Sequence, residues 1–328
     1  MDFPYTKNYM KSPLYYFNNL KKYNCIYKDI NYENKNKDNI YYKDFDNNIH
    51  YYNKLILYNN EDYNTINILT DYFTEEERVK AKVKKSKLSP YNYYQLNKLR
   101  INTIFNKKKY PNKKDRIYNM REYIYSKCKE ATLFKITSGY SVIKYICNDL
   151  KLDISKLNIL DPSSGWGDRL IIFLGLGVNS YIGYDPNINL QKGYNEIIKT
   201  LGNKKQQNNY KVKCLGFEYC DEKDKYDIVF TSPPYYDYEE YTNDESQSYI
   251  KYKTLNEWKY NFFTIYINNC YNACKKNGII CIHISDSKNI HIVSYLHELM
   301  INLKCKKYIN FGIIGNKHTL PIWCWIKL

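Results

Sequence analysis

From about residue 135 onward, short runs of β-branched and aliphatic residues alternate with longer stretches of helical spacing. This alternation predicts a mostly parallel sheet with helices packed on both faces. The predicted strands are residues 158–160, 181–184, 211–215, 227–230 and 279–283. The predicted helices between and around them are residues 142–150, 169–176, 190–201, 255–274 and 290–303. Two last strand-like runs, 308–314 and 322–328, have no helical stretch between them and should pair antiparallel. We therefore predict an α/β, Rossmann-like, doubly wound sheet with a C-terminal antiparallel hairpin at one edge.

The residues before this pattern have a different texture. Residues 1 to about 65 are dominated by Tyr, Asn, Lys and Asp without clear periodicity, and we expect them to be irregular. A helix is expected to start at Thr74, a capping residue followed by three glutamates, and to continue through the basic stretch 78–85. We divide the chain into an N-terminal extension, residues 1–130, mainly helical or irregular, and an α/β domain, residues 131–328.

A second helix is expected at residues 91–105, after the break at Ser89-Pro90. Lysines at 107–109 and at 113–114 should then form a basic loop. Such a run is either a solvated face or a surface that follows phosphates, and both interpretations stay open.

The charge of the whole chain bears on that choice. Fifty Lys and Arg against 34 Asp and Glu leave a formal charge of +16, which favours a polyanionic partner such as nucleic acid. A/T-rich codons would by themselves raise the content of Lys, Asn, Tyr and Ile, so part of this excess reflects composition. Bidentate readout of guanine by arginine can come from few positions. The five arginines are Arg78, Arg100, Arg116, Arg121 and Arg169.

The ten cysteines show no CxxC pair and no zinc-type spacing with histidine, so we expect no metal site. Scattered thiols suit a reducing cytoplasm. The chain starts without the apolar core of a signal peptide and contains no run of about 18 apolar residues, and we expect a soluble, cytoplasmic protein without membrane contact.

The turn after the first predicted strand is the first candidate binding site. It reads Asp161-Pro162-Ser163-Ser164-Gly165-Trp166-Gly167. Glycines there allow a tight turn and close approach of the backbone to a ligand. Asp185 follows the second strand, where a carboxylate can accept both hydroxyls of a ribose. Glu218 and Asp221 follow the third strand, near the expected place of an adenine, and the sequence does not choose between them. Since the turn lacks the full GxGxxG pattern, S-adenosylmethionine fits better than a dinucleotide.

The fourth strand leads directly into Ser232-Pro233-Pro234-Tyr235. Two prolines fix an extended backbone and remove two N–H donors, which leaves carbonyl oxygens and the Ser232 hydroxyl as acceptors. If Ser232 Oγ and the Pro233 carbonyl accepted hydrogen bonds from both N–H groups of an exocyclic base amine, the nitrogen lone pair would be exposed for attack on a sulfonium methyl. Tyr235 would stack on a base rotated out of its helix.

Together the glycine turn and this strip resemble motifs I and IV of the S-adenosylmethionine-dependent amino-methyltransferases that make N4-methylcytosine or N6-methyladenine. The resemblance covers residues 135–328 and implies a class I methyltransferase fold. It implies cofactor contacts at Asp161, Gly165, Gly167 and Asp185, and base contacts at Ser232, Pro233, Pro234 and Tyr235. Thr137-Ser138-Gly139-Tyr140 resembles the segment that meets the methionine end of the cofactor. The strings Gly-Trp-Gly-Asp-Arg and Phe-Thr-Ser-Pro-Pro-Tyr are also similar to solitary methyltransferases of phages and large DNA viruses. A viral or mobile-element origin would suit the composition.

One departure from the family concerns target recognition. About 63 residues separate Gly167 from Thr231, too few for the recognition domain usual in DNA-modifying members. Recognition should therefore come from residues 1–130, from the acidic loop 236–252, or from both. The loop would be a mobile lid or would accept hydrogen bonds from a base amine.

The strip does not fix the base or the polymer. Serine at its first position favours N4 of cytosine over N6 of adenine, and the resemblance favours DNA over RNA. Methylation of cytosine C5 is excluded because its nucleophile needs a Pro-Cys pair, which the sequence lacks. The alternatives are an RNA base N-methyltransferase and a catalytically idle relative that binds nucleic acid.

Overall fold

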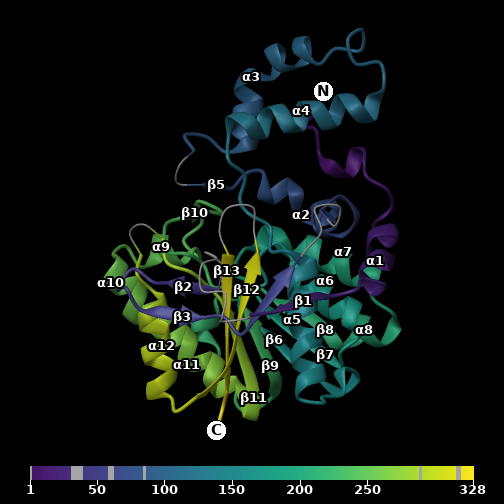
Figure 1. The fold of residues 1–328 in the computed structure, drawn as a ribbon. Helices are drawn as coiled ribbons and strands as arrows, with labels where there is room; N and C mark the ends of the chain where they lie inside the picture. The colour runs from purple at the N-terminus through teal and green to yellow at the C-terminus, as the bar shows by residue number, and fades with distance from the viewer. Residues whose placement is uncertain (1, 31–39, 58–62, 84–85, 288–289, 315–318) are drawn as a thin grey trace.

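The computed structural model describes residues 2–30, 40–57, 63–83, 86–287, 290–314 and 319–328 (Figure 1). Its centre is a nine-stranded sheet in the order β1-β4-β12-β13-β11-β9-β6-β7-β8. The parallel part comprises β6 (Asn158–Asp161), β7 (Ser180–Tyr184), β8 (Tyr210–Lys213), β9 (Tyr226–Thr231) and β11 (Cys274–His283). The last two strands, β12 (Lys306–Ile314) and β13 (Thr319–Ile326), form an antiparallel hairpin in which β13 pairs with β11. The predicted fold class is confirmed by this strand order and pairing. The hairpin does not lie at the edge of the sheet as predicted, because two strands of the N-terminal segment continue the sheet beyond β12.

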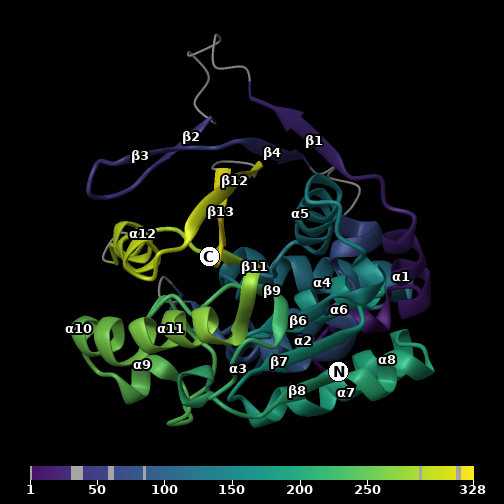
Figure 2. The ribbon, with the colours of Figure 1, turned by 90° about the horizontal axis from the view of Figure 1, so that it is seen from below.

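Alternate residues of the central strands face two different cores, as the pleat of a strand requires. Ile159 of β6 belongs to the core under one layer of helices, while its neighbour Leu160 belongs to the core under the other. The first layer contains α5 (Ile136–Asp149), α6 (Asp168–Leu176), α7 (Gln191–Leu201) and α8 (Lys204–Asn209). The second contains α9 (Ser248–Lys251), α10 (Leu255–Glu257), α11 (Thr264–Ala273) and α12 (Val293–Asn302), with a π-helical turn at Trp258–Phe263. Figure 2 shows the two layers on opposite sides of the sheet.

Part of the N-terminal segment belongs to this sheet, which corrects the expectation that residues 1 to about 65 are irregular. β4 (Lys54–Leu57) pairs parallel with β12, and β1 (Ile26–Asp29) pairs antiparallel with β4. These four-residue strands are too short to show a period in the sequence, and the free edge of β12 specifies them. Before them, α1 (Pro13–Lys21) buries Phe17 and Leu20 in the first core. A small hairpin of β2 (Tyr41–Lys43) and β3 (Ile49–Tyr51) lies beside α12, where the Ser294 hydroxyl donates to Asp44.

The helix expected from Thr74 to about residue 85 is wrong at both ends. The actual helix, α2 (Asp71–Arg78), starts three residues earlier, and the Thr74 hydroxyl donates to the Trp166 carbonyl at 2.8 Å rather than capping a helix. The helix ends at Arg78, whose side chain is buried in an ion pair with Asp71. The chain then forms β5 (Lys82–Val83), which pairs antiparallel with β10 (Glu239–Glu240).

A helical hairpin completes the extension. α3 (Pro90–Ile104) begins after a Ser89 cap, close to the predicted helix. α4 (Lys113–Lys127) starts inside the segment predicted as a basic loop, because Asn112 caps its first turn. Within the described residues, no helix is long and apolar enough to span a membrane.

Candidate active site

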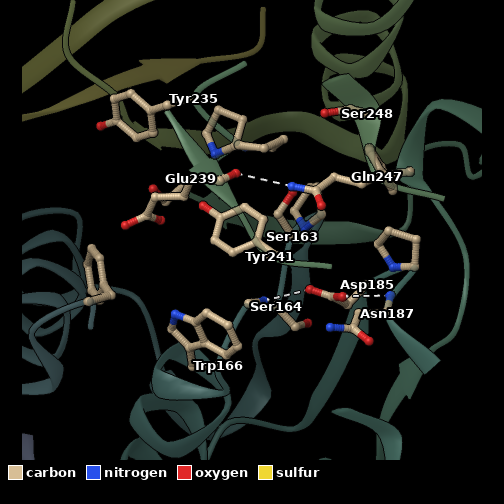
Figure 3. Close-up of a pocket in the computed structure, with 18 of the residues that line it drawn as sticks. Ser163, Ser164, Trp166, Asp185, Asn187, Tyr235, Glu239, Tyr241, Gln247 and Ser248 are labelled. Carbon is tan, nitrogen blue, oxygen red and sulfur yellow. Dashed lines mark hydrogen bonds between the residues drawn. The ribbon is translucent and has the colours of Figure 1, made fainter. Parts of the chain in front are cut away.

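A cavity of about 520 Å³ opens at the carboxyl ends of β6, β7, β8, β9 and β11 (Figure 3). β6 lies between β7 and β9, so the order of the strands along the chain reverses at this point. Open α/β sheets bind ligands where such a reversal leaves a crevice. The walls combine aromatic and apolar side chains with a few polar groups, as is usual for small-molecule sites.

The turn from β6 to α6 forms one wall. Gly165 and Gly167 have φ angles of 55° and 98°, which side-chain-bearing residues rarely adopt. A Cβ on Gly167 would also lie 2.8 Å from Cδ1 of Ile197, so the turn requires glycine there for two reasons. Pro162, Ser163 and Gly165 line the cavity. Gly167 does not line it and is the N-cap residue of α6.

Asp185, at the tip of β7, faces the same wall. Its Oδ2 accepts from the Gly165 N–H at 2.9 Å and its Oδ1 from the Asn187 N–H at 3.0 Å (Figure 3). Burial raises the pKa of this carboxyl to about 6. Each oxygen keeps a second lone pair, so the carboxylate can still accept from a diol in the cavity.

Asp161 does not line the cavity. Its oxygens accept from Arg169 Nε at 3.0 Å and from the Tyr181 hydroxyl at 2.8 Å. Arg169 also donates to the Ser163 carbonyl, so Asp161 supports the turn from beneath.

The strip that follows β9 forms the opposite wall: Ser232, Pro233, Pro234 and Tyr235 all line the cavity. The Tyr266 hydroxyl of α11 connects the two walls, because it lies 2.6 Å from Thr231 Oγ1 and 2.9 Å from Ser163 Oγ. The Tyr235 hydroxyl accepts from the Ser285 N–H at 3.2 Å, and burial raises its pKa to about 12, so the phenol is neutral.

Residues 236–252, which we call the strap, cross over the cavity. β10 within the strap is paired with β5 of the extension, and Glu239 Oε1 accepts from the Thr132 N–H at 3.1 Å. Gln247 Nε2 donates to the Glu239 carbonyl at 3.1 Å (Figure 3). The ring of Tyr241 packs edge-on against Trp166 with centroids 5.7 Å apart. In this structure the first part of the strap is thus held by β5 of the extension and by Thr132.

Acidic groups dominate the charge of the cavity. Burial raises the pKa of Glu239 and Glu218, and raises that of Asp168 to about 6. His283 is half-buried, its Nδ1 lies 2.8 Å from the Pro321 carbonyl oxygen, and desolvation lowers its pKa to about 4, so it is neutral. Among the described residues, no group of three or more His, Cys, Asp and Glu could hold a metal ion.

Not every predicted cofactor residue lies at the cavity. Thr137, Ser138 and Tyr140 are buried in α5, where Thr137 bonds to Asn67. The segment just before them lines the cavity instead: Thr132, Leu133 and Phe134. Glu218 lines the cavity, whereas the side chain of Asp221 is 92% exposed, so the structure brings only the first of these two acids to the site.

Three lining residues fall outside every segment that the sequence interpretation assigned to binding or recognition: Phe134, Tyr266 and His283. Trp166, in the turn, and Tyr241 and Gln247, in the loop 236–252, fall inside such segments but had no individual role. Trp166 lies between the two glycines of the turn and could have been chosen for that reason. The others come from elements far apart in the chain, and no local pattern marks them.

No model of a known protein family matches the chain, and no curated protein matches it. Solved structures do show similar folds. Magnesium protoporphyrin IX methyltransferase of Synechocystis PCC 6803, solved with bound S-adenosylmethionine, is 9% identical, with 60% of this chain and 86% of that chain covered and a TM-score of 0.42. The 1,6-didemethyltoxoflavin-N1-methyltransferase of Burkholderia thailandensis, solved with S-adenosylhomocysteine, is 12% identical, with 58% and 76% covered and a TM-score of 0.40. An S-adenosylmethionine-dependent O-methyltransferase of Thermotoga maritima is 13% identical, with 61% and 73% covered and a TM-score of 0.36.

The strand order and pairing decide the fold. The chain has the class I methyltransferase fold.

Proposed function

We propose that this protein transfers a methyl group from S-adenosylmethionine to the exocyclic amino group of a base in DNA, with N4 of cytosine favoured over N6 of adenine. One observation carries the proposal: the glycine turn, Asp185 and the strip Ser232-Pro233-Pro234-Tyr235 line a single cavity. Direct transfer requires the methyl donor and the accepting amine to be bound side by side in one cavity.

The cavity has the features that the cofactor needs. The backbone of the turn is open at Gly165, where the cofactor can approach closely, and Asp185 would accept from the ribose hydroxyls. Glu218 and Phe217, which follow β8 and line the cavity, would lie along the adenine. The acidic lining favours a ligand with a positive sulfonium centre. S-adenosylmethionine supplies a methyl group on a good leaving group, so the protein needs to supply position more than basicity.

On the opposite wall, Ser232 Oγ and the Pro233 carbonyl would accept the two amine protons. The prolines hold these acceptors in a fixed place, since neither ring allows the backbone to rotate about φ. The link from Thr231 through Tyr266 to Ser163 would keep the strip at a constant distance from the turn.

Both alternative functions would use the same cavity between the glycine turn and the strip. An RNA base could enter as readily as a DNA base, because the strip contacts an amine and a ring and not a sugar. An idle nucleic-acid-binding relative would bind cofactor and polymer without transfer.

The test is transfer of a tritiated methyl group to DNA, RNA and protein by the wild type and by Ser232→Ala. We expect label on DNA, reduced about 100-fold in the variant because a positioned hydrogen bond to the reacting group is lost. Affinity for S-adenosylhomocysteine should not change, since Ser232 lies on the amine side. Ser155→Ala, which removes an exposed hydroxyl far from the cavity, is the matched control and should transfer normally.

Three outcomes would contradict the proposal: label on protein alone, no label with any polymer, or full activity of Ser232→Ala. Mass spectrometry of nucleosides from the labelled polymer names the modified base, and label on RNA alone would favour the first alternative.

A further inference from the structure

The α3–α4 hairpin holds most of the net positive charge of the molecule. Residues 90–129, which we call the basic arm, contain eleven Lys and Arg and two acids, a net +9 out of the chain's +16. The remaining 288 residues therefore share a net +7. Charge in the arm cannot be explained by composition alone, because the same A/T-rich bias acts on the whole chain.

Most of this charge is available to a partner. Lys107, Lys108, Lys109, Lys113 and Lys114 are exposed at the tip between the two helices. Within the described part of the chain, none of these five forms an ion pair with an acid.

The arginines divide into four that are buried inside the protein and one that is exposed to a partner. Arg78, Arg116, Arg121 and Arg169 are buried, and each has hydrogen-bond partners inside the protein. Arg100 is exposed on α3. It lies on one exposed face of α3, together with Asn92, Gln95, Leu96, Leu99 and Thr103, and we call this the uncovered face. Leu99 is 87% exposed, an unusual degree for a leucine in a helix.

The two helices of the arm pack together around a small hydrophobic core. Tyr94, Ile101 and Phe105 on the inner face of α3 pack against Met120 and Ile124 of α4, with all five buried. Each helix has 15 residues and is therefore about 22 Å long.

Both ends of the arm are attached beside the cavity. Lys129 N–H donates to Ser86 Oγ at 2.9 Å, which closes the base of the hairpin. Three residues before Ser86, β5 pairs with the strap, and three residues after Lys129, Thr132 lines the cavity. Figure 1 shows the arm projecting from the end of the molecule where β5 and β10 lie.

We propose that the basic arm binds the phosphate backbone of the nucleic-acid substrate through its tip lysines, with the uncovered face of α3 lying against the polymer. The inference rests on the proposed function, since it assigns a surface to the substrate of that same site. A duplex carries one phosphate charge per about 1.7 Å, so about 22 Å of it presents about 13 charges to an arm of this length. Arg100, with a planar group able to bond two acceptors of guanine, is the residue of this face best suited to contact a base edge.

The experiment measures binding apart from methyl transfer. Fluorescence anisotropy with a labelled 30-base-pair DNA duplex, and with an RNA duplex of the same sequence, gives Kd over a range of salt concentration. The test variant is Lys107→Gln/Lys108→Gln/Lys109→Gln. The matched control is Lys199→Gln/Lys204→Gln/Lys205→Gln, three exposed lysines that precede β8 and so lie at the opposite end of the sheet.

We expect the arm variant to bind at least tenfold more weakly, and its plot of log Kd against log salt to lose about three units of slope, about one for each phosphate contact. The control should bind like the wild type, and both should melt at the wild-type temperature. Equal binding by both triple variants would overturn the inference, as would a loss of binding in the control alone.

Arg100→Ala tests the face of α3. Methylation of a random-sequence duplex library, read by sequencing, should show a weakened guanine preference at one position near the modified base. Arg100→Lys should not restore it, because an ammonium does not form the bidentate contact. An unchanged preference, or a change of oligomeric state on Leu96→Lys/Leu99→Lys with duplex binding intact, would assign this face to a protein partner instead.

The two proposals can fail separately. If the wild type methylates no polymer but the arm variant still loses duplex affinity, the proposed binding by the arm is supported and the proposed activity is contradicted. If methyl transfer to DNA occurs and the arm variant binds normally, the proposed activity is supported and the proposed binding by the arm is contradicted.

Discussion

Asp185 is a carboxylate with both oxygens already bonded to backbone N–H groups, and that arrangement sets its chemistry. The two bonds lower its pKa while burial raises it, and burial dominates, leaving the pKa at about 6. The proposed ribose contact needs acceptors, so it needs the ionised form. Protonation below pH 6 removes acceptor capacity, and we therefore expect cofactor affinity to be constant above pH 7 and to fall at lower pH.

Titration calorimetry with S-adenosylhomocysteine at pH 8, 7, 6 and 5 measures this. Asp185→Asn should bind about tenfold more weakly at pH 8, because the amide nitrogen opposes one of the two N–H donors. Its pH dependence should also be shallower, with the remainder due to Asp168 and Glu218, whose pKa values are also raised. A flat wild-type profile between pH 5 and 8 would show that Asp185 does not hold the ligand.

At the scale of elements, the sequence predicted residues 131–328 well and the extension poorly. Apart from β10, the strands from β6 to β13 contain buried runs such as Ile159-Leu160 and Ile279–Ile282, whose hydrophobicity is local information. β5 and β10 have two residues each, and their pairing depends on contact between segments more than 150 residues apart. The same contrast holds in the site: the strip and the turn are local patterns, whereas Tyr266 reaches the cavity through the packing of α11.

The β5–β10 ladder is expected to control the strap. Val83→Pro removes a backbone donor and crowds the ladder, which should release β10. Lys82→Ala removes only the partly exposed ion pair to Glu240 at 3.0 Å, a contact worth at most about 1 kcal/mol. We expect hydrogen exchange at residues 239–241 to become at least tenfold faster in Val83→Pro and to change little in Lys82→Ala. Similar exchange in the two variants would mean that side chains rather than the ladder hold the strap.

At the scale of the whole molecule, the extension and the sheet share one interior. Phe17, Leu20 and Ile56 lie in the same core as Ile159 of β6. The Thr70 hydroxyl donates to Asp168, and the Thr74 hydroxyl to the Trp166 carbonyl, so α2 is bonded directly to the turn beside the cavity. The boundary at residue 130 therefore marks a proposed change of role within a continuous core.

A buried charge network in the extension offers a way to test whether the extension and the sheet unfold together. Arg121 Nε donates to Glu75 Oε1 at 2.9 Å, and its Nη2 donates to Asp71 Oδ2 at 3.1 Å. Arg121→Met would leave two buried carboxylates short of a partner, and should destabilise the protein by about 3–5 kcal/mol. Arg100→Met makes the same chemical change at an exposed position and should cost no more than about 0.5 kcal/mol.

The four tryptophans, Trp166, Trp258, Trp323 and Trp325, all lie outside the extension, and of these Trp323 packs against Tyr42 and His50 of the extension, so their fluorescence during urea unfolding reports mainly on the sheet. If the extension and the sheet unfold together, Arg121→Met shifts the tryptophan transition to lower urea concentration, and the far-ultraviolet circular dichroism transition coincides with it. If the extension unfolds separately, the tryptophan midpoint stays at its wild-type value while circular dichroism shows an earlier loss of helix. The first outcome is expected, because removing the extension would expose the apolar side chains that α1 and β4 bury against the sheet, and the sheet would lose that stabilisation at the same step.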